Sequence, residues 1–165
     1  MFNINDFIVY GSTGVCQITD ITKNDHDEPE YYVLRPVYDN KINNMVIKAL
    51  INNSKVQIRK VVTKDQVSSL IASMPVKETI WIDDSRERSE CFKALLKTGE
   101  CEEWIKLVKT LYLEKELRSA EGKTLTHTDE DIMRTAEKRL CEEFAIALNL
   151  SPAEVLSYIL EHVKH

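Results

Sequence analysis

Histidine and cysteine are the residue types in this chain that most often bind metals or act as nucleophiles. The four cysteines form no C-x-x-C pair, and their gaps suit neither a zinc site nor a disulfide framework, so we expect small buried apolar residues. They are Cys16, Cys91, Cys101 and Cys141. Of the four histidines only His162 and His165 are close, and a single H-x-x-H pair is a weak metal signal. We therefore expect no metal site and no cofactor.

None of the common catalytic motifs is present. The sequence has no P-loop, no dinucleotide-binding glycine pattern, no H-E-x-x-H and no G-x-S-x-G. Gly11-Ser12-Thr13-Gly14 could bind an anion through backbone N–H groups, but a tight turn between two strands is the commoner structure for such a run. The acidic clusters at 83–84, 102–103 and 129–131 lie at expected helix starts, where the helix dipole explains them. We therefore expect a binding protein without enzymatic activity or a small-molecule substrate.

The charge of the chain limits how it could bind nucleic acid. The net charge is −5 over 165 residues, and since the first 75 residues carry equal numbers of acidic and basic side chains, the acidic excess falls in residues 76–165. Any DNA contact must then be local, or be delivered by a partner that already holds the DNA. We find no secretory leader pattern and no apolar run that would span a membrane, so we expect a cytoplasmic protein with no membrane partner.

Residues 1–62 are expected to form a small β-rich module. Five runs of strand-forming residues alternate with clusters of turn residues, which favours a small barrel. The expected strands are 7–10, 15–21, 31–37, 45–51 and 55–62. Regular alternation within 15–21 would place Ile18 and Ile21 on opposite faces of the sheet.

Residues 63–165 are expected to form an all-α helical bundle, which makes the fold class α+β. The expected helix starts are Thr63, Asp84, about 101, 128–131 and Ser151, and they are marked by capping residues and apolar residues at helical spacing. The first helix should end before Pro75, and Gly99 should cap the second. Residues 73–84 are expected to form an extended connector.

An ordered series of short motifs extends over almost the whole chain, beginning with the N-terminal run FNINDFIVYGSTGVCQITDI. The residues that carry the series are Phe2, Asp6, Val9, Tyr10, Gly14, Val15, Tyr31, Val33, Leu34, Arg59, Val61, Val62, Arg86, Arg88, Phe92, Leu95 to Gly99, and Glu142 to Phe144. In order and spacing they resemble the CarD/CdnL-type bacterial transcription regulators, which open with an F-x-x-G-D-x-V-V-Y-P-x-H-G-V-like signature.

This resemblance implies a Tudor/SH3-like barrel at 1–62 that docks on the RNA polymerase β subunit through an edge strand and nearby basic residues. The helical domain at 63–165 would contact promoter DNA at the upstream edge of the transcription bubble without reading its sequence. The protein would thereby modulate the stability of the open promoter complex. The candidate polymerase-binding residues are Lys23, Met45, Val46, Ile47 and Lys48. An internal strand at 45–51 is the alternative, because alternation alone does not distinguish an edge strand.

The candidate DNA-binding residues are Trp81, Arg86, Arg88, Arg134 and Lys138. Arg86 and Arg88 lie at a helix start, where the dipole disfavours positive charge, and this placement indicates phosphate contacts. Glu87 and Glu90 could instead neutralise these arginines. Arg134 and Lys138 are i, i+4 neighbours on one helical face.

The sequence departs from the family signature at several positions. The usual Pro and His of Y-P-x-H-G are Gly11 and Thr13, and Ser85 occupies the position of a tryptophan that wedges into the DNA minor groove. Either Trp81 takes over the wedge, or Trp81 belongs to the core and the wedge is missing. The second alternative motivates another function, an adaptor that binds polymerase without direct DNA contact.

Overall fold

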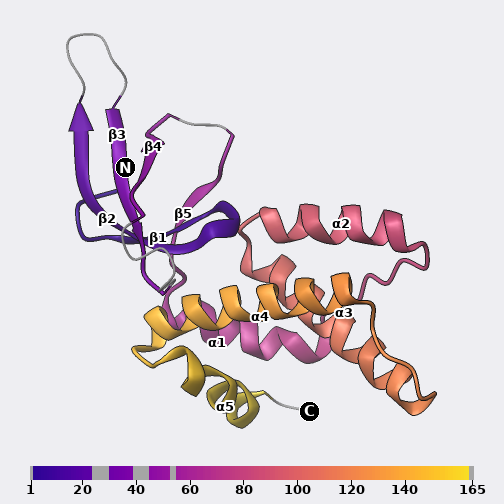
Figure 1. The fold of residues 1–165 in the computed structure, drawn as a ribbon. Helices are drawn as coiled ribbons and strands as arrows, with labels where there is room; N and C mark the ends of the chain where they lie inside the picture. Colours follow the sequence, from indigo (N-terminus) through magenta and orange to yellow (C-terminus); the bar gives the residue numbers. More distant parts are fainter. Residues whose placement is uncertain (1, 24–29, 39–44, 53–54, 164–165) are drawn as a thin grey trace. The chain divides into compact units, whose positions relative to one another are not determined.

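In the computed structural model the chain forms two compact units, Met1–Val61 and Val62–His165 (Figure 1). The structure describes residues 2–23, 30–38, 45–52 and 55–163. All strands lie in the first unit and all α-helices in the second, so the predicted α+β class is confirmed.

The N-terminal unit is an antiparallel sheet with the strand order β4-β3-β2-β1-β5. The strands are β1 (Phe7–Tyr10), β2 (Gly14–Lys23), β3 (Glu30–Pro36), β4 (Ile47–Leu50) and β5 (Ile58–Lys60), with the 3-10 turn η1 (Gly11–Thr13) after β1. All five predicted strands are present, although β4 and β5 are shorter than expected. Within the described residues β4 pairs only with β3 and β5 only with β1, so the closure of the sheet into a barrel stays a prediction.

One face of this sheet carries the core of the unit. Its buried residues are Ile8, Cys16, Ile18, Tyr32, Leu34 and Ala49. Ile21 packs against the same cluster, so the prediction that it lies opposite Ile18 is wrong. The reason is a β-bulge at Thr19, where the pairing of β2 with β3 shifts between Ile18 and Asp20. The extra residue in β2 turns the following side chains to the other face.

The helical unit follows its local capping signals closely. Its elements are α1 (Lys64–Ser73), the 3-10 turn η3 (Met74–Val76), α2 (Ser85–Lys97), α3 (Cys101–Ala120), α4 (His127–Leu148) and α5 (Pro152–His162). Thr63 and Gln66 form the predicted capping box, Asp84 caps α2, and Glu154 accepts hydrogen bonds from the backbone and hydroxyl of Ser151. The start of α4 was predicted too late, because Thr126 is its N-cap and accepts from the Asp129 N–H.

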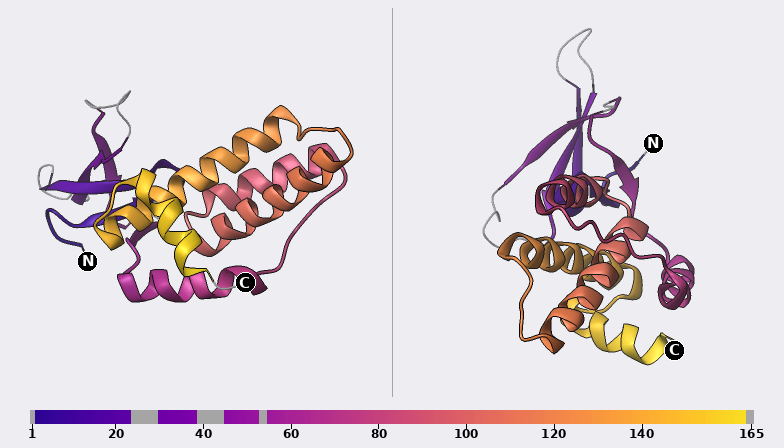
Figure 2. Two further views of the ribbon diagram at one scale, coloured as in Figure 1. Left: turned by 90° about the horizontal axis from the view of Figure 1, so that it is seen from below. Right: turned by 90° about the vertical axis from the view of Figure 1, so that its right-hand side faces the viewer.

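Helices α3 and α4 supply most of the core of this unit, and Figure 2 shows them side by side with α2. The core residues of these two helices include Trp104, Leu107, Leu111, Met133, Ala136, Leu140 and Phe144. Phe92 of α2 and Val155 of α5 are also fully buried. Residues 77–84 connect η3 to α2 without regular structure, so the connector predicted at 73–84 begins four residues later than expected, because α1 extends to Ser73 and η3 follows it.

No single helix among the described residues is long and apolar enough to cross a membrane. Helices α4 and α5 are long and apolar enough only when they are taken together, and the chain bends by 85° between them.

Candidate functional site

Strand β4 lies at one edge of the described sheet, where it pairs with β3 alone. The Ile51 N–H donates to the Glu30 carbonyl oxygen at 3.1 Å, and hydrogen-bonded pairs alternate along an antiparallel ladder. The pairs Ala49–Tyr32 and Ile47–Leu34 are therefore the bonded ones. The main-chain groups of Lys48 and Leu50 consequently point away from β3, toward the open edge. The alternative of an internal strand at 45–51 does not hold for the described sheet.

The side chains of β4 alternate as predicted. Ala49 faces the core and Ile47 is half-buried beside it, while Lys48 and Leu50 are exposed on the outer face. Met45 and Val46 are exposed and lie just before the strand. The edge thus combines outward main-chain groups with apolar side chains and one cation.

The register adds two residues that the sequence analysis did not single out. Tyr31 lies opposite Leu50, and Val33 lies opposite Lys48, so both belong to the outer face beside the edge. Alternation within the Y-x-V-L motif would have shown that they share a face, but only the pairing with β4 shows which face. Lys23 ends β2 opposite Glu30, in line with Ile51 and two strands away from β4.

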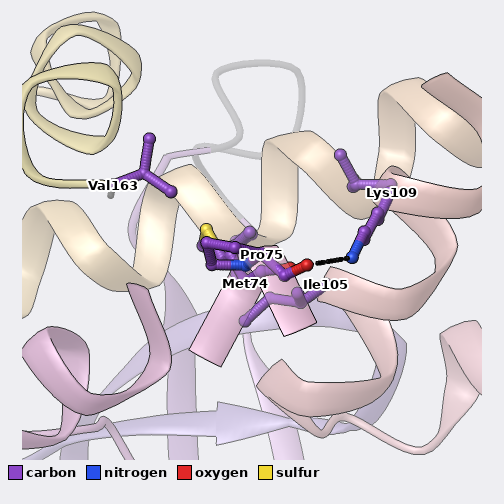
Figure 3. Close-up of a pocket in the computed structure, with 7 residues that line it drawn as sticks. Met74, Pro75, Ile105, Lys109 and Val163 are labelled. Atoms are coloured by element: carbon purple, nitrogen blue, oxygen red, sulfur yellow. Dashed lines mark hydrogen bonds between the residues drawn. The ribbon is translucent and has the colours of Figure 1, made fainter. Parts of the chain in front are cut away.

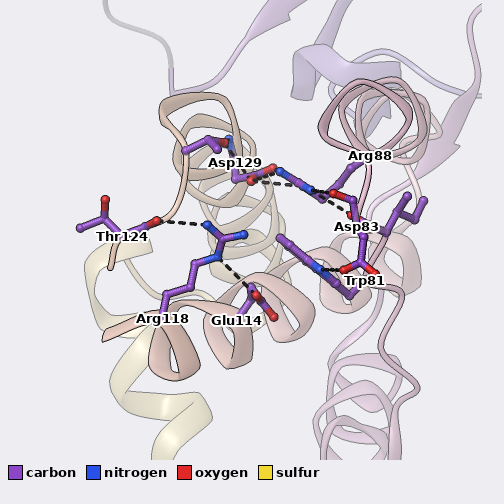
Figure 4. Close-up of polar contacts among 9 residues, drawn as sticks. Trp81, Asp83, Arg88, Glu114, Arg118, Thr124 and Asp129 are labelled. Carbon is purple, nitrogen blue, oxygen red and sulfur yellow. Dashed lines mark hydrogen bonds and ion pairs between the residues drawn. The ribbon is translucent and has the colours of Figure 1, made fainter. Parts of the chain in front are cut away.

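Arg88, which was expected to contact DNA, is buried instead. Its Nη2 and Nε donate to the Asp129 carboxylate at 2.9 and 3.1 Å, and its Nη1 donates to the carbonyl oxygens of Ile82 and Asp83 (Figure 4). The prediction for Arg88 is therefore wrong, because its donors are used to join α2, the connector and α4. The signal was misleading because a basic residue at a helix start can also pair with a carboxylate that is distant in sequence.

Trp81 lies in the connector beside this ion pair. The guanidinium carbon of Arg88 is 4.3 Å from the ring centroid of Trp81 and that of Arg118 is 5.5 Å away. The ring also meets Phe92 edge-on, and its Nε1 donates to Asp83 at 3.1 Å. Trp81 is half-buried and lines a surface pocket of about 440 Å³ with Ile80 and Ile82. The contacts with Phe92 and Arg88 favour the core alternative, whereas the partial exposure of the ring favours the wedge alternative. Contact of Trp81 with DNA stays a prediction.

Arg118 of α3 was not found from the sequence, although it contributes to the same cluster. Its Nε donates to Glu114 and its Nη1 to the carbonyl oxygen of Thr124, both at 3.3 Å (Figure 4). These contacts hold its guanidinium near Trp81. Nothing in the local pattern around Arg118 distinguishes it from an ordinary solvent-exposed arginine.

The other predicted DNA contacts are exposed but have acidic neighbours. Arg86 lies 3.7 Å from Glu90, Arg134 3.3 Å from Glu130, and Lys138 3.9 Å from Glu142. Arg134 and Lys138 lie in α4, as expected. Surface pairs of this kind are weak, so each cation remains accessible to a phosphate.

The cysteines and one buried glutamate are the remaining groups that could support chemistry. All four cysteines are free, and Cys16, Cys101 and Cys141 are buried as expected, while Cys91 is half-buried. Glu143 is buried in α4, where its carboxylate accepts from the Cys101 thiol and from the Val62 N–H, both at 2.9 Å. Within the described residues no three His, Cys, Asp or Glu side chains gather as a metal site, and His165 lies outside those residues.

One family model matches the N-terminal part of the chain. Residues 2–62 match the family model of the CarD-like/TRCF RID domain. No curated protein matches the chain. The matched range covers the whole sheet, including the β4 edge, and it agrees with the resemblance found in the sequence motifs. Residues 2–62 are therefore similar to the domain by which CarD-like proteins interact with RNA polymerase.

Proposed function

We propose that this protein is a bacterial transcription regulator that docks on the β subunit of RNA polymerase through strand β4 and modulates the stability of the open promoter complex. The observation that carries the proposal is the open edge of β4 within a domain of a polymerase-interacting family. We infer that this function requires no catalytic step and no cofactor. We also infer that the protein acts in the cytoplasm, where the polymerase is.

The docking would proceed by strand addition. A segment of the β subunit would pair with the outward main-chain groups of Lys48 and Leu50, since an open edge offers unpaired donors and acceptors. Exposed Met45, Val46 and Leu50 would contact apolar side chains of that segment. The ammonium group of Lys48 would favour a carboxylate beside them.

Reversal of one charge tests the docking. We expect Lys48→Glu to weaken binding to a purified β-subunit fragment about tenfold, because a carboxylate would then face an acidic partner. Lys60→Glu is the matched control, because Lys60 is also exposed but lies on β5 at the other edge of the described sheet. Equal effects of both variants, or no binding by the unmodified protein, would contradict the proposal.

The helical domain would act on promoter DNA through the cations that remain accessible. Arg86, Arg134 and Lys138 are the candidates after the correction at Arg88, and Trp81 is the candidate for a base-step contact. Phosphate contacts of this kind carry no sequence information, which suits a regulator that acts at many promoters. Because the domain is acidic overall, the contacts would depend on polymerase holding the DNA nearby.

An adaptor without direct DNA contact is the second candidate. Two observations favour it, since Arg88 is used inside the domain and each of the three accessible candidate cations has a carboxylate within 4 Å. The combined variant Arg86→Ala, Arg134→Ala, Lys138→Ala separates the two candidates. A shortened open-complex lifetime with unchanged β binding would support DNA contact, whereas an unchanged lifetime would support the adaptor.

A further inference from the structure

Trp81 lies in a segment that has no regular structure of its own. Residues 77–84 belong to neither a helix nor a strand, so no ladder of main-chain hydrogen bonds holds them. Main-chain groups that are removed from water need other partners. In this segment the side chains of neighbouring helices supply such partners on both sides of Trp81.

The beginning of the connector is attached to α3 by Lys109. This residue lies at the rim of a cavity of about 260 Å³ that η3, α3, α4 and Val163 line (Figure 3). Its ammonium donates to the carbonyl oxygens of Met74, Pro75 and Lys77 at 3.1, 3.0 and 2.7 Å. The first residues of the connector are therefore fixed against α3.

Two further side chains hold the backbone on either side of Trp81. Before it, the Ile80 N–H donates to the buried Oγ1 of Thr110 at 3.1 Å. After it, Nη1 of Arg88 donates to the carbonyl oxygens of the next two residues at 2.9 and 3.2 Å. Because the backbone is held on both sides, the direction in which the Trp81 side chain leaves it depends on these contacts.

Asp129 determines where the Arg88 guanidinium lies. Nε and Nη2 of Arg88 donate to the Asp129 carboxylate at 3.1 and 2.9 Å (Figure 4). The Thr126 hydroxyl donates to the same carboxylate at 2.8 Å, and both charged side chains are buried. The guanidinium carbon also lies 4.3 Å from the centroid of the Trp81 ring, within the range of a cation–π contact. Arg88 thus contacts both the ring and the backbone that follows it.

Burial alone does not fix the Trp81 ring. The ring is half-buried and meets Phe92 edge-on, whereas Trp104, the other tryptophan of the chain, is fully buried. A second guanidinium, that of Arg118, lies 5.5 Å from the Trp81 centroid. A half-buried ring can change rotamer unless other contacts hold it, so the contacts with charged groups contribute to its orientation.

We propose that Arg88 and Asp129 are positioning residues for Trp81, whose ring they hold in the half-exposed orientation from which it contacts a base step of promoter DNA. This inference rests on the proposed function, which assigns that contact to Trp81. Insertion of an indole between bases has to offset the loss of base stacking. A ring that is already in place loses less conformational freedom on binding. The ion pair would therefore act on the DNA complex without touching DNA.

Fluorine NMR of the full chain labelled with 5-fluorotryptophan tests the position of the ring. The chain has two tryptophans, so Trp81→Phe assigns both resonances. Arg88→Lys keeps a cation beside Asp129, but a single ammonium cannot reproduce the fork that joins the carboxylate to the connector. We expect this variant to move the Trp81 resonance toward that of free 5-fluorotryptophan and to leave the Trp104 resonance in place.

A second variant of the pair and a control complete this measurement. Asp129→Asn should move the Trp81 resonance in the same direction, because Arg88 would lose its counter-charge. Val155→Ala is the control for a loss of stability alone, since Val155 is fully buried in α5, which packs on α4 and α1. An unmoved Trp81 resonance in either variant of the pair, or an equal movement in Val155→Ala, would overturn the proposal.

The lifetime of the open promoter complex measures the consequence for DNA. We expect Arg88→Lys to shorten it at least about twofold, the lower end of the coupling between residues in contact, with unchanged binding to the β-subunit fragment. In the Trp81→Ala background Arg88→Lys should have no further effect, because the side chain that it positions is absent. Further shortening in the double variant would show that Arg88 acts on DNA directly and would overturn the proposal.

The inference and the proposed function fail in different ways. If Trp81→Ala leaves the lifetime unchanged, the DNA contact in the proposed function is wrong, and the fluorine resonances decide the positioning independently. If Trp81→Ala shortens the lifetime and Arg88→Lys does not, the DNA contact stands and the positioning by the ion pair is wrong.

Discussion

Arg88 of α2 and Asp129 in the first turn of α4 form a buried ion pair, with Nη2 2.9 Å from Oδ2. Their side chains are only 3% and 2% exposed, and 41 residues separate them in the chain. The Thr126 hydroxyl donates to the same carboxylate, and the Trp81 ring lies over the guanidinium. The pair therefore fixes three segments of the helical domain against one another.

Removal of the charge of Asp129 should destabilise the protein strongly. We expect Asp129→Asn to lower the free energy of unfolding by about 3–5 kcal/mol, because Arg88 would remain buried without its counter-charge. Asp131→Asn is the control, since that carboxylate is largely exposed and should change stability by less than about 1 kcal/mol. Urea unfolding of the full chain measures both, and similar values for the two variants would contradict a structural role for the pair.

Restoration of the family proline at position 11 should destabilise this protein. Gly11 has a φ of 46°, and its N–H donates to the Gln57 carbonyl oxygen at 2.9 Å. Proline cannot adopt that φ, and it has no N–H to donate that hydrogen bond. We therefore expect Gly11→Pro to lower the free energy of unfolding by about 2–3 kcal/mol. Thr13→His, which restores the other family residue, should stay within about 1 kcal/mol. Greater stability of Gly11→Pro in thermal unfolding would show that the turn differs from this structure.

Alkaline pH should destabilise the protein through Cys141. Burial raises the pKa of the Cys141 thiol to about 11, with smaller contributions from the carboxylates of Glu137 and Glu142. The folded chain keeps this proton to a higher pH than the unfolded chain, so the stabilising contribution is complete at neutral pH and is lost as pH rises toward 11. The pKa of Tyr112 is also raised, chiefly by burial and by its hydrogen bond to Glu137.

Unfolding between pH 8 and pH 11 tests this dependence. The free energy of unfolding should decrease over this range in the unmodified protein and decrease less in Cys141→Ala. Alkylation of the native protein at neutral pH should modify half-buried Cys91 before Cys141. The same pH slope in both proteins would exclude Cys141 as the cause.

The ammonium of Lys109 should hold the beginning of the connector in place. Lys109→Met keeps the apolar stem but removes three charged hydrogen bonds, so we expect a loss of about 2–3 kcal/mol in unfolding free energy. Amide exchange at Ile80, whose N–H donates to Thr110 Oγ1, should become faster. Lys106→Met is the control, because Lys106 pairs only with the neighbouring Glu103 at 3.4 Å. Unchanged exchange at Ile80 in Lys109→Met would contradict this role.

Local signals predicted the helices better than the details of the sheet. The residues at Thr63, Asp84 and Ser151 act within one helical turn, so their hydrogen bonds can be read from adjacent residues. The bulge at Thr19 could not be read in this way, because it depends on the register with β3. Ile21 was assigned to the wrong face for that reason.

The same distinction between local signals and long-range contacts applies to the candidate sites. By itself, the sequence determined the order of five strands and five helices, the absence of the common catalytic motifs, and the motif series that identifies a polymerase-interacting domain. These features depend on local hydrogen bonding and on residue types in a fixed order. Only the tertiary structure decided that β4 is an edge strand of the described sheet, that Arg88 pairs with Asp129, and that η3, α3, α4 and Val163 line one cavity. Each of these depends on contacts between segments far apart in the chain, where the partner determines whether a side chain is exposed or buried.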